Sequence, residues 1–172
     1  DRASVIKKLK DLGCKFSEVL HQVDRIFTPK GTPFISPLET PVLRVRRQND
    51  IYLFTLKISQ SNRQDSLERE LEISDGEKMI EILNLIGFEE FIPVEKKRIK
   101  TNFNDIEIVL DDVKDLGHFI EAEKIVKTEN HEDRKKTQEK FFDFLETLGV
   151  KKEDRVIDGK YDIMLWEKLK KK

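Results

Sequence analysis

Basic side chains occupy alternate positions in short, strand-like segments of this chain. Arg44 and Arg46 are two residues apart, as are Lys96 and Arg98, and Lys57 stands in a third alternating segment. Residues two apart on a β-strand point to the same face of a sheet. Because guanidinium and ammonium groups bind phosphate oxygens well, these faces are candidates for binding a polyphosphate.

Acidic side chains alternate in the same way on other segments. Glu70 and Glu72 share one predicted strand face, Glu121 and Glu123 share another, and Asp111 ends a third predicted strand. Their carboxylate oxygens are suitable ligands for Mg²⁺ or Mn²⁺. For any one strand, the alternative interpretation is that the charged face binds no ligand and is simply the solvated side of an antiparallel sheet.

The signs of these charges are segregated by strand, whereas a surface built for solubility would mix both signs. A sheet that curls around the charged faces would enclose cations and carboxylates. Such groups are costly to bury unless an ionic ligand fills the space between them. A polyphosphate with a hard cation fits both sets of side chains.

Alternation of apolar and polar residues predicts the strands that carry these side chains. The predicted strands are residues 23–27, 42–47, 51–59, 67–73, 94–99, 106–111 and 119–126. Only residues 48–50 separate the second strand from the third, so these two strands should pair as a hairpin.

Apolar residues at helical spacing predict three helices, each of which stops at a glycine. They cover residues 5–12, 74–86 and 141–148, they end at Gly13, Gly87 and Gly149, and a polar run at 127–140 precedes the third. Ser74 and Glu77 match a capping box, which predicts that Ser74 caps the second helix. The apolar stripes of the first and third helices are expected to be packing faces.

Composition limits the classes of partner. The 172 residues suit one domain, and Lys+Arg 33 nearly cancel Asp+Glu 34, so no overall field favours a nucleic acid or an anionic membrane. Cys14 is the only cysteine, and no apolar run is long enough for a signal peptide or a membrane helix. The sequence therefore predicts a soluble, cytoplasmic protein with no nucleic-acid or membrane partner.

Taken in order, these segments resemble the CYTH superfamily of class IV adenylate cyclases and of thiamine and inorganic triphosphatases. The motifs are Leu43-Arg44-Val45-Arg46, Thr55-Leu56-Lys57, Arg69-Glu70-Leu71-Glu72, Glu95-Lys96-Lys97-Arg98, Asp111, Leu116-Gly117-His118-Phe119, and Glu121 with Glu123. They follow one another in a consistent order over roughly residues 5–165, which makes them more specific together than singly. The resemblance implies an α+β fold, an antiparallel β-barrel or triphosphate tunnel with helices packed on its outside, formed by one domain over residues 1–172.

The resemblance also implies a metal-dependent enzyme with a triphosphate substrate such as ATP. Conversion of ATP to cyclic AMP and pyrophosphate is the first expectation, hydrolysis of inorganic, thiamine or nucleoside triphosphate is the alternative, and a non-catalytic polyphosphate-binding or nucleotide-binding module is a further one. The implied phosphate ligands are Arg44, Arg46, Lys57, Lys96 and Arg98, of which Lys57 and Arg98 would be catalytic. The implied ligands of Mg²⁺ or Mn²⁺ are Glu70, Glu72, Asp111, Glu121 and Glu123. A homodimer is left open.

The sequence departs from the family pattern at both ends. Family members begin with a strand of the form Glu-x-Glu-x-Lys, which is missing here, so we expect the natural polypeptide to extend upstream of Asp1 by about one strand. Lys160 and Tyr161 only loosely match the final Ser-Tyr segment of the family, and no role is assigned to them. The loop at 28–40 is either a tunnel-mouth loop that selects substrate or a plain connection. Trp166 is either a surface anchor or a core residue.

Overall fold

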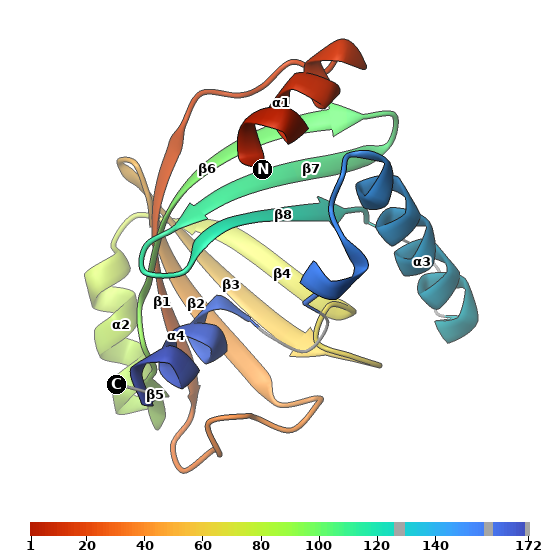
Figure 1. Cartoon of the computed structure of the whole chain (residues 1–172). Helices are drawn as coiled ribbons and strands as arrows, with labels where there is room; N and C mark the ends of the chain where they lie inside the picture. Colours follow the sequence, from red (N-terminus) through yellow and green to blue (C-terminus); the bar gives the residue numbers. More distant parts are fainter. Residues whose placement is uncertain (126–129, 157–159, 171–172) are drawn as a thin grey trace. The chain divides into compact units, whose positions relative to one another are not determined.

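The computed structural model describes residues 1–125, 130–156 and 160–170, which form helices and strands in mixed order (Figure 1). The helices are α1 (Arg2–Asp11), α2 (Gly76–Leu85), α3 (His131–Thr147) and α4 (Tyr161–Lys170), with a short 3₁₀ helix at Lys152–Asp154. The strands are β1 (Leu20–Pro29), β2 (Pro41–Gln48), β3 (Ile51–Ser59), β4 (Ser66–Ile73), β5 (Phe88–Glu90), β6 (Val94–Phe103), β7 (Ile106–Val113) and β8 (Gly117–Glu123).

The strands form one sheet in the order β4-β3-β2-β1-β6-β7-β8, and β5 pairs with β1. The pairs β1–β2, β1–β5, β2–β3 and β3–β4 are antiparallel. Gln48 pairs with Ile51 across a turn in which Asn49 has a positive φ of 50°, so the predicted hairpin is confirmed. The α+β class is confirmed as well, whereas closure of the sheet into a barrel belongs to the proposal made below.

Contacts among the described residues divide the chain into two compact units. The first unit is Asp1–Val19, Arg98–Asp112 and His118–Val156, and the second unit is Leu20–Lys97, Val113–Gly117 and Ile157–Lys172. The prediction of one domain over residues 1–172 stays a prediction. Val126 of the predicted strand 119–126, and residues 127–129 of the predicted polar run, lie outside the described residues.

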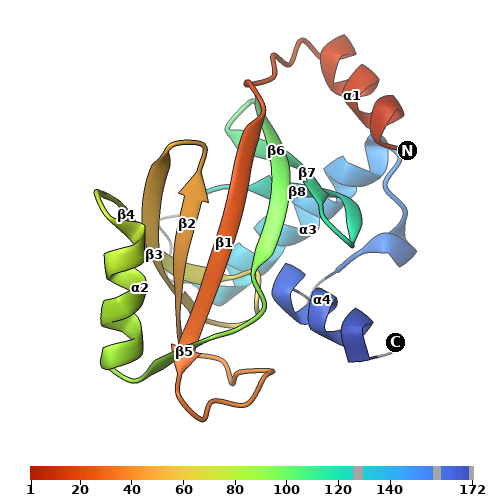
Figure 2. The same ribbon diagram turned by 90° about the vertical axis from the view of Figure 1, so that its left-hand side faces the viewer.

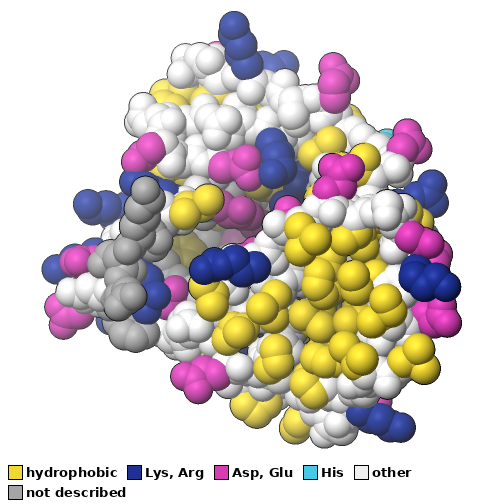
Figure 3. All heavy atoms as spheres, turned by 180° about the vertical axis from the view of Figure 1, so that it is seen from behind, with side chains coloured by type: hydrophobic (Ala, Val, Ile, Leu, Met, Phe, Trp, Pro, Cys, Tyr) yellow, Lys and Arg dark blue, Asp and Glu magenta, His cyan; other side chains and the backbone are white. Residues whose placement is uncertain are grey.

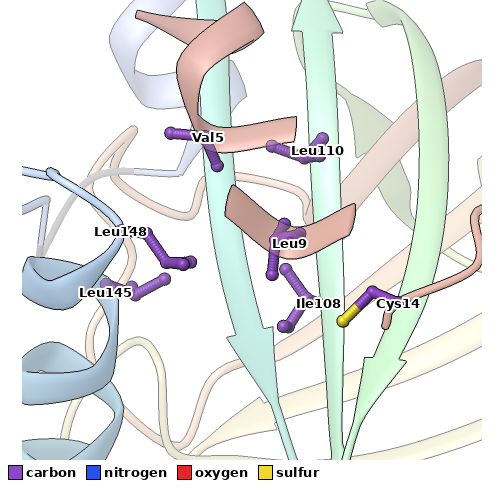
Figure 4. Close-up of a cluster of buried hydrophobic side chains, with 7 residues drawn as sticks. All are labelled: Val5, Leu9, Cys14, Ile108, Leu110, Leu145 and Leu148. Carbon is purple, nitrogen blue, oxygen red and sulfur yellow. The ribbon is translucent and has the colours of Figure 1, made fainter. Parts of the chain in front are cut away.

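The first unit has a core built from three elements (Figure 4). Apolar side chains of α1, β7 and α3 meet there, together with the buried side chain of the only cysteine. The residues are Val5, Leu9, Cys14, Ile108, Leu110, Leu145 and Leu148. The stripes of the first and third predicted helices are therefore packing faces, as expected.

The second unit has its own core, in which α2 packs against β2, β3 and β5 (Figure 2). Phe27 and Val45 are fully buried there against Leu83 of α2. Asp75, rather than the predicted Ser74, caps α2, since its carboxylate accepts a hydrogen bond of 2.8 Å from the backbone N–H of Lys78. Both residue types are good N-caps, and the structure uses the one nearer to the first turn.

The second unit also exposes apolar side chains. They include Leu67 and Leu71 of β4, and Ile82 of α2, each about half exposed. Figure 3 shows hydrophobic side chains gathered on the face seen from behind. Large apolar patches often mark protein–protein contacts, so the homodimer stays an open prediction. Among the helices that the structure describes, none is long and apolar enough to cross a membrane.

Candidate functional site

The register of β1 to β4 brings charged side chains of the second unit onto one face of the sheet. Because residues paired across strands point to the same side, their charged groups lie in rows. The rows are Asp24 with Arg46, Arg44 with Thr55 and Glu70, and Lys57 with Glu68. We refer to these residues, together with Lys96 of β6, as the charged face. The alternation predicted for Arg44, Arg46 and Lys57 is observed.

Asp24 connects two cations of the charged face. Its carboxylate accepts hydrogen bonds from Arg46 Nε (2.5 Å to Oδ1) and Nη2 (2.8 Å to Oδ2), and Lys96 Nζ lies 3.3 Å from Oδ2. All three side chains are buried. Burial alone would raise the pKa of Asp24, but the hydrogen bonds from Arg46 and the charge of Lys96 outweigh it and hold this pKa far below its ordinary value. Asp24 is therefore ionised at neutral pH.

Arg44 forms a second network with β3 and β4. Its Nη2 donates to Thr55 Oγ1 and to Glu70 Oε2, both at 3.0 Å, and the Thr55 hydroxyl donates to the same Glu70 oxygen at 2.7 Å. Burial, and next the charge of Arg46, lower the pKa of Arg44. Burial opposes ionisation of Glu70, yet the Thr55 hydrogen bond and the Arg44 charge lower its pKa overall. Within the described part of the chain, the buried Nε of Arg44 has no hydrogen-bond partner.

Lys57 is the more accessible cation of the charged face. Its Nζ lies 2.6 Å from Glu68 Oε1, and 25% of its side chain is exposed. An ion pair with this exposure contributes little to stability, since water screens it. Lys57 can therefore contact a ligand at a lower desolvation cost than the buried Arg46.

Arg98 is the centre of a separate cluster in the first unit. Its Nε and Nη2 donate to the two carboxylate oxygens of Asp111 at 2.7 and 2.6 Å, and Nη2 lies 3.2 Å from Glu121 Oε2. Burial would lower the pKa of Arg98, but the Asp111 hydrogen bond and the charges of Glu121, Asp111 and Glu123 raise it overall. Arg98 is therefore held as a cation among carboxylates. We call Asp111, Glu121 and Glu123 the carboxylate cluster.

The predicted metal ligands fall into different surroundings. Glu70 is already paired with Arg44. Glu72, two residues further along β4, is exposed. Glu121 and Glu123 lie two residues apart on β8, and Asp111 is paired with Arg98. Among the described residues, no group of three or more His, Cys, Asp or Glu side chains is placed to hold a metal ion.

The donor chemistry of the carboxylate cluster nevertheless fits a hard cation. Mg²⁺ usually takes one or two carboxylates, several waters and phosphate oxygens of the substrate, rather than a complete set of protein ligands. Glu121 and Glu123 supply two carboxylates of this kind on one strand face.

Sequence reasoning missed Asp24 of the charged face, and it gave no role to Glu68, which alternates with Glu70 and Glu72 on one predicted strand face. Asp24 falls in the predicted strand 23–27, and with Gln22 it forms an alternating polar pair that could have signalled a charged face. Asp24 pairs with Arg46, 22 residues away, and Glu68 pairs with Lys57, 11 residues away, so both pairs depend on strand register rather than on spacing within one segment.

The segments that carry the charged face and the carboxylate cluster are similar to segments of known proteins. A model of the CYTH domain matches residues 2–159. The chain therefore belongs to the CYTH family. The match covers the segments that supply both groups of charged residues, and it bears out the resemblance drawn from the motifs.

One sequence relative and two solved structures are similar to this CYTH chain. A Methanocaldococcus jannaschii protein named "Putative adenylate cyclase MJ0240" is 33% identical over 163 residues, which cover 94% of this chain and 90% of that protein. The structure of the PH1819 protein from Pyrococcus horikoshii has a TM-score of 0.80 at 28% identity and covers 96% and 94% of the two chains. The Hippeastrum protein HpAC1, whose structure is described as revealing a dominant triphosphatase activity, has a TM-score of 0.60 at 14% identity and covers 98% and 91%. At that identity, the likeness to HpAC1 concerns the fold alone.

Proposed function

We propose that this CYTH protein is a metal-dependent enzyme that converts ATP to cyclic AMP and pyrophosphate. The observation that carries the proposal is the charged face, on which four cations are held in fixed positions by carboxylates. The cations are Arg44, Arg46, Lys57 and Lys96. Two of these cations, Arg46 and Lys96, are buried, which is costly for the fold, and an anionic ligand offsets that cost. Family membership and the name of the Methanocaldococcus jannaschii relative support the same reaction.

The ion pairs prepare the cations for a polyanion before it binds. Asp24 holds Arg46 through Nε and Nη2, and the other terminal nitrogen, Nη1, takes no part in that pair. Arg44 brings a buried Nε that has no partner among the described residues. Donors that are already oriented stabilise phosphate charge without a cost of reorganisation. Closure of the sheet into a tunnel, as the family resemblance implies, is part of this proposal.

The reaction itself moves charge onto pyrophosphate. The ribose 3′-oxygen bonds to the α-phosphorus, the bond from that phosphorus to the bridging oxygen breaks, and the 3′-hydroxyl proton leaves to solvent. Pyrophosphate departs with the electron pair of the broken bond, so its negative charge increases in the transition state. Lys57 and Arg98 are the proposed catalytic residues, and each would stabilise that charge as a fixed cation.

Glu121 and Glu123 are the proposed principal ligands of Mg²⁺ or Mn²⁺, with Asp111, Glu70 and Glu72 as further ligands. When bound, such an ion neutralises phosphate charge and makes the phosphorus easier to attack. The protein residues would bind the ion through carboxylate oxygens, the ligand type it prefers.

Hydrolysis of a triphosphate is the second candidate. The side chains of the charged face are ligands for phosphate, which ATP, thiamine triphosphate and tripolyphosphate share. If water rather than the 3′-hydroxyl attacks, the same cations serve a triphosphatase. The activity described for HpAC1 belongs to that protein, and it makes this second reaction worth testing here.

A product assay separates these candidates. The protein is incubated with ATP, thiamine triphosphate or tripolyphosphate, with and without Mg²⁺ or Mn²⁺, and the products are separated by anion-exchange chromatography. The proposal predicts equal amounts of cyclic AMP and pyrophosphate from ATP. Orthophosphate from all three substrates would instead establish the triphosphatase. Tight binding without turnover of any substrate would indicate a non-catalytic binding module and would contradict the proposal that the protein is an enzyme.

A further inference from the structure

A further cation reaches the charged face from the other end of the chain. Lys160 directly precedes α4 and is half-buried. Its charged neighbours come from three other places: Lys57 on β3, Arg63 between β3 and β4, and Glu68 on β4. All of these residues belong to the second unit.

The segment that carries Lys160 is fixed by packing. Lys96 Nζ lies 5.0 Å from the centre of the Tyr161 ring, and the Trp166 ring stacks on Phe34 with the centroids 3.8 Å apart and the planes 13° apart. Asp162, which follows Tyr161 in the chain, is buried. These contacts hold α4 in place, so Lys160 is presented from an ordered element rather than from a loose tail.

Arg63 is held by a hydrogen bond to the backbone. Its Nη2 donates a hydrogen bond of 2.8 Å to the carbonyl oxygen of Ser36. A guanidinium anchored through one nitrogen keeps its other donors for a further partner. Lys57 is held by Glu68 at 2.6 Å, so all three cations have defined surroundings.

The charges around Lys160 do not balance. Three cations, Lys57, Arg63 and Lys160, face two carboxylates. One of these, Glu68, is bound to Lys57, and burial raises the pKa of the other, Asp162, which favours its neutral form. Within the described residues, Oδ1 of Asp162 has no hydrogen-bond partner. Burial, and next the charge of Lys57, lower the pKa of Lys160, as expected for a cation among cations.

We propose that Lys160, Lys57 and Arg63 form an anion subsite that takes the terminal phosphate of a polyphosphate chain. The proposal rests on the function proposed above and adds Lys160 and Arg63, to which the sequence analysis assigns no role. A terminal phosphate suits the subsite because its second ionisation occurs near pH 6, so it carries about two negative charges at neutral pH. An inner phosphate carries one and would balance the cluster less completely. Lys160 would therefore be a positioning residue that favours a linear polyphosphate, which has terminal phosphates, over a cyclic one, which has only inner phosphates.

Calorimetric titration tests the subsite with two ligands, linear tripolyphosphate and cyclic trimetaphosphate, whose three phosphates are all inner ones. The proteins are the wild type, Lys160→Met, Lys160→Arg and the control Lys78→Met, which removes an exposed lysine of α2 whose described partner is Glu81. We expect Lys160→Met to weaken tripolyphosphate binding about tenfold or more, as is typical of a lost charged hydrogen bond, and to weaken trimetaphosphate binding less. Lys160→Arg should restore most of the preference for tripolyphosphate, and Lys78→Met should bind both ligands like the wild type.

The outcomes distinguish a failure of the proposed subsite from a failure of the proposed function. If the wild type does not bind tripolyphosphate, the proposed function itself fails. If the wild type binds but Lys160→Met binds equally well, the subsite is wrong and the function stands. An equal loss for both ligands, or no rescue by arginine, would show that Lys160 acts through structure alone and would also overturn the subsite. Thermal melting of each variant identifies any loss of fold.

Discussion

Asp24 of β1 and Arg46 of β2 are register partners, and they form a two-pronged ion pair at 2.5 and 2.8 Å that is buried on both sides. Lys96 shares the same carboxylate at 3.3 Å. One aspartate thus fixes two of the four cations proposed to bind phosphate on the charged face.

Replacing Asp24 with asparagine should destabilise the protein strongly. The change leaves Arg46 and Lys96 buried without their common counter-charge, and breaking one side of a buried ion pair typically costs about 3–5 kcal/mol. Urea unfolding measures the difference. Asp50→Asn, at an exposed position of the β2–β3 turn, is the control and should change stability by less than about 0.5 kcal/mol. Similar values for the two variants would show that Asp24 does not stabilise the buried cations.

Stability should fall in acid because of the same carboxylate. The folded protein holds the pKa of Asp24 below its ordinary value of 3.8, so the unfolded chain takes up a proton first as the pH falls. The contribution of Asp24 is fully present above that ordinary value and is lost as the pH drops toward the lower folded pKa. Urea unfolding between pH 6 and pH 2 should show a steeper decline for the wild type than for Asp24→Asn. Parallel pH profiles would contradict this assignment.

Arg44 and Arg47 test the facing of β2. Arg44 shares the charged face with Glu70, whereas Arg47 is exposed and points to the other side of the strand. Arg44→Ala should weaken tripolyphosphate binding by about 1.5–3 kcal/mol, and Arg47→Ala should have little effect. Calorimetry measures both variants under one salt condition. Equal losses would mean that general surface charge, rather than the charged face, binds the ligand.

The stack of Phe34 on Trp166 should hold α4 in place. Trp166 is the only tryptophan, so its fluorescence reports on this helix directly. Phe34→Ala should shift the emission to longer wavelength and lower stability by about 1 kcal/mol or more, because an aromatic pair contributes roughly 0.5–1.5 kcal/mol beyond its burial. Leu38→Ala, at an exposed position of the same loop, should leave the emission unchanged. An unchanged spectrum in Phe34→Ala would place Trp166 outside the stack.

Strand facing could be predicted from the sequence because it depends only on the period of two. That period is sufficient to place Arg44 with Arg46 on one strand face, and Glu70 with Glu72 on another. The carboxylate partners were not predictable in this way, since Asp24 and Arg46 are 22 residues apart and meet only through strand register. Helix α4 was also missed, because Ile163, Met164, Leu165 and Trp166 are consecutive and show no stripe. For α2, Ser74 and Asp75 are both suitable cap residue types. The sequence alone therefore does not show which of the two the backbone places at the cap.

The most direct test of the central claim is the rate of cyclic AMP and pyrophosphate formation from ATP, measured against the concentration of free Mg²⁺. We predict no turnover in excess chelator, a saturable rise as Mg²⁺ is added, and equal amounts of the two products. Arg44→Ala should lower the rate strongly at every Mg²⁺ concentration, while Arg47→Ala should not. Full turnover in excess chelator, or no consumption of ATP at any Mg²⁺ concentration, would contradict the central claim.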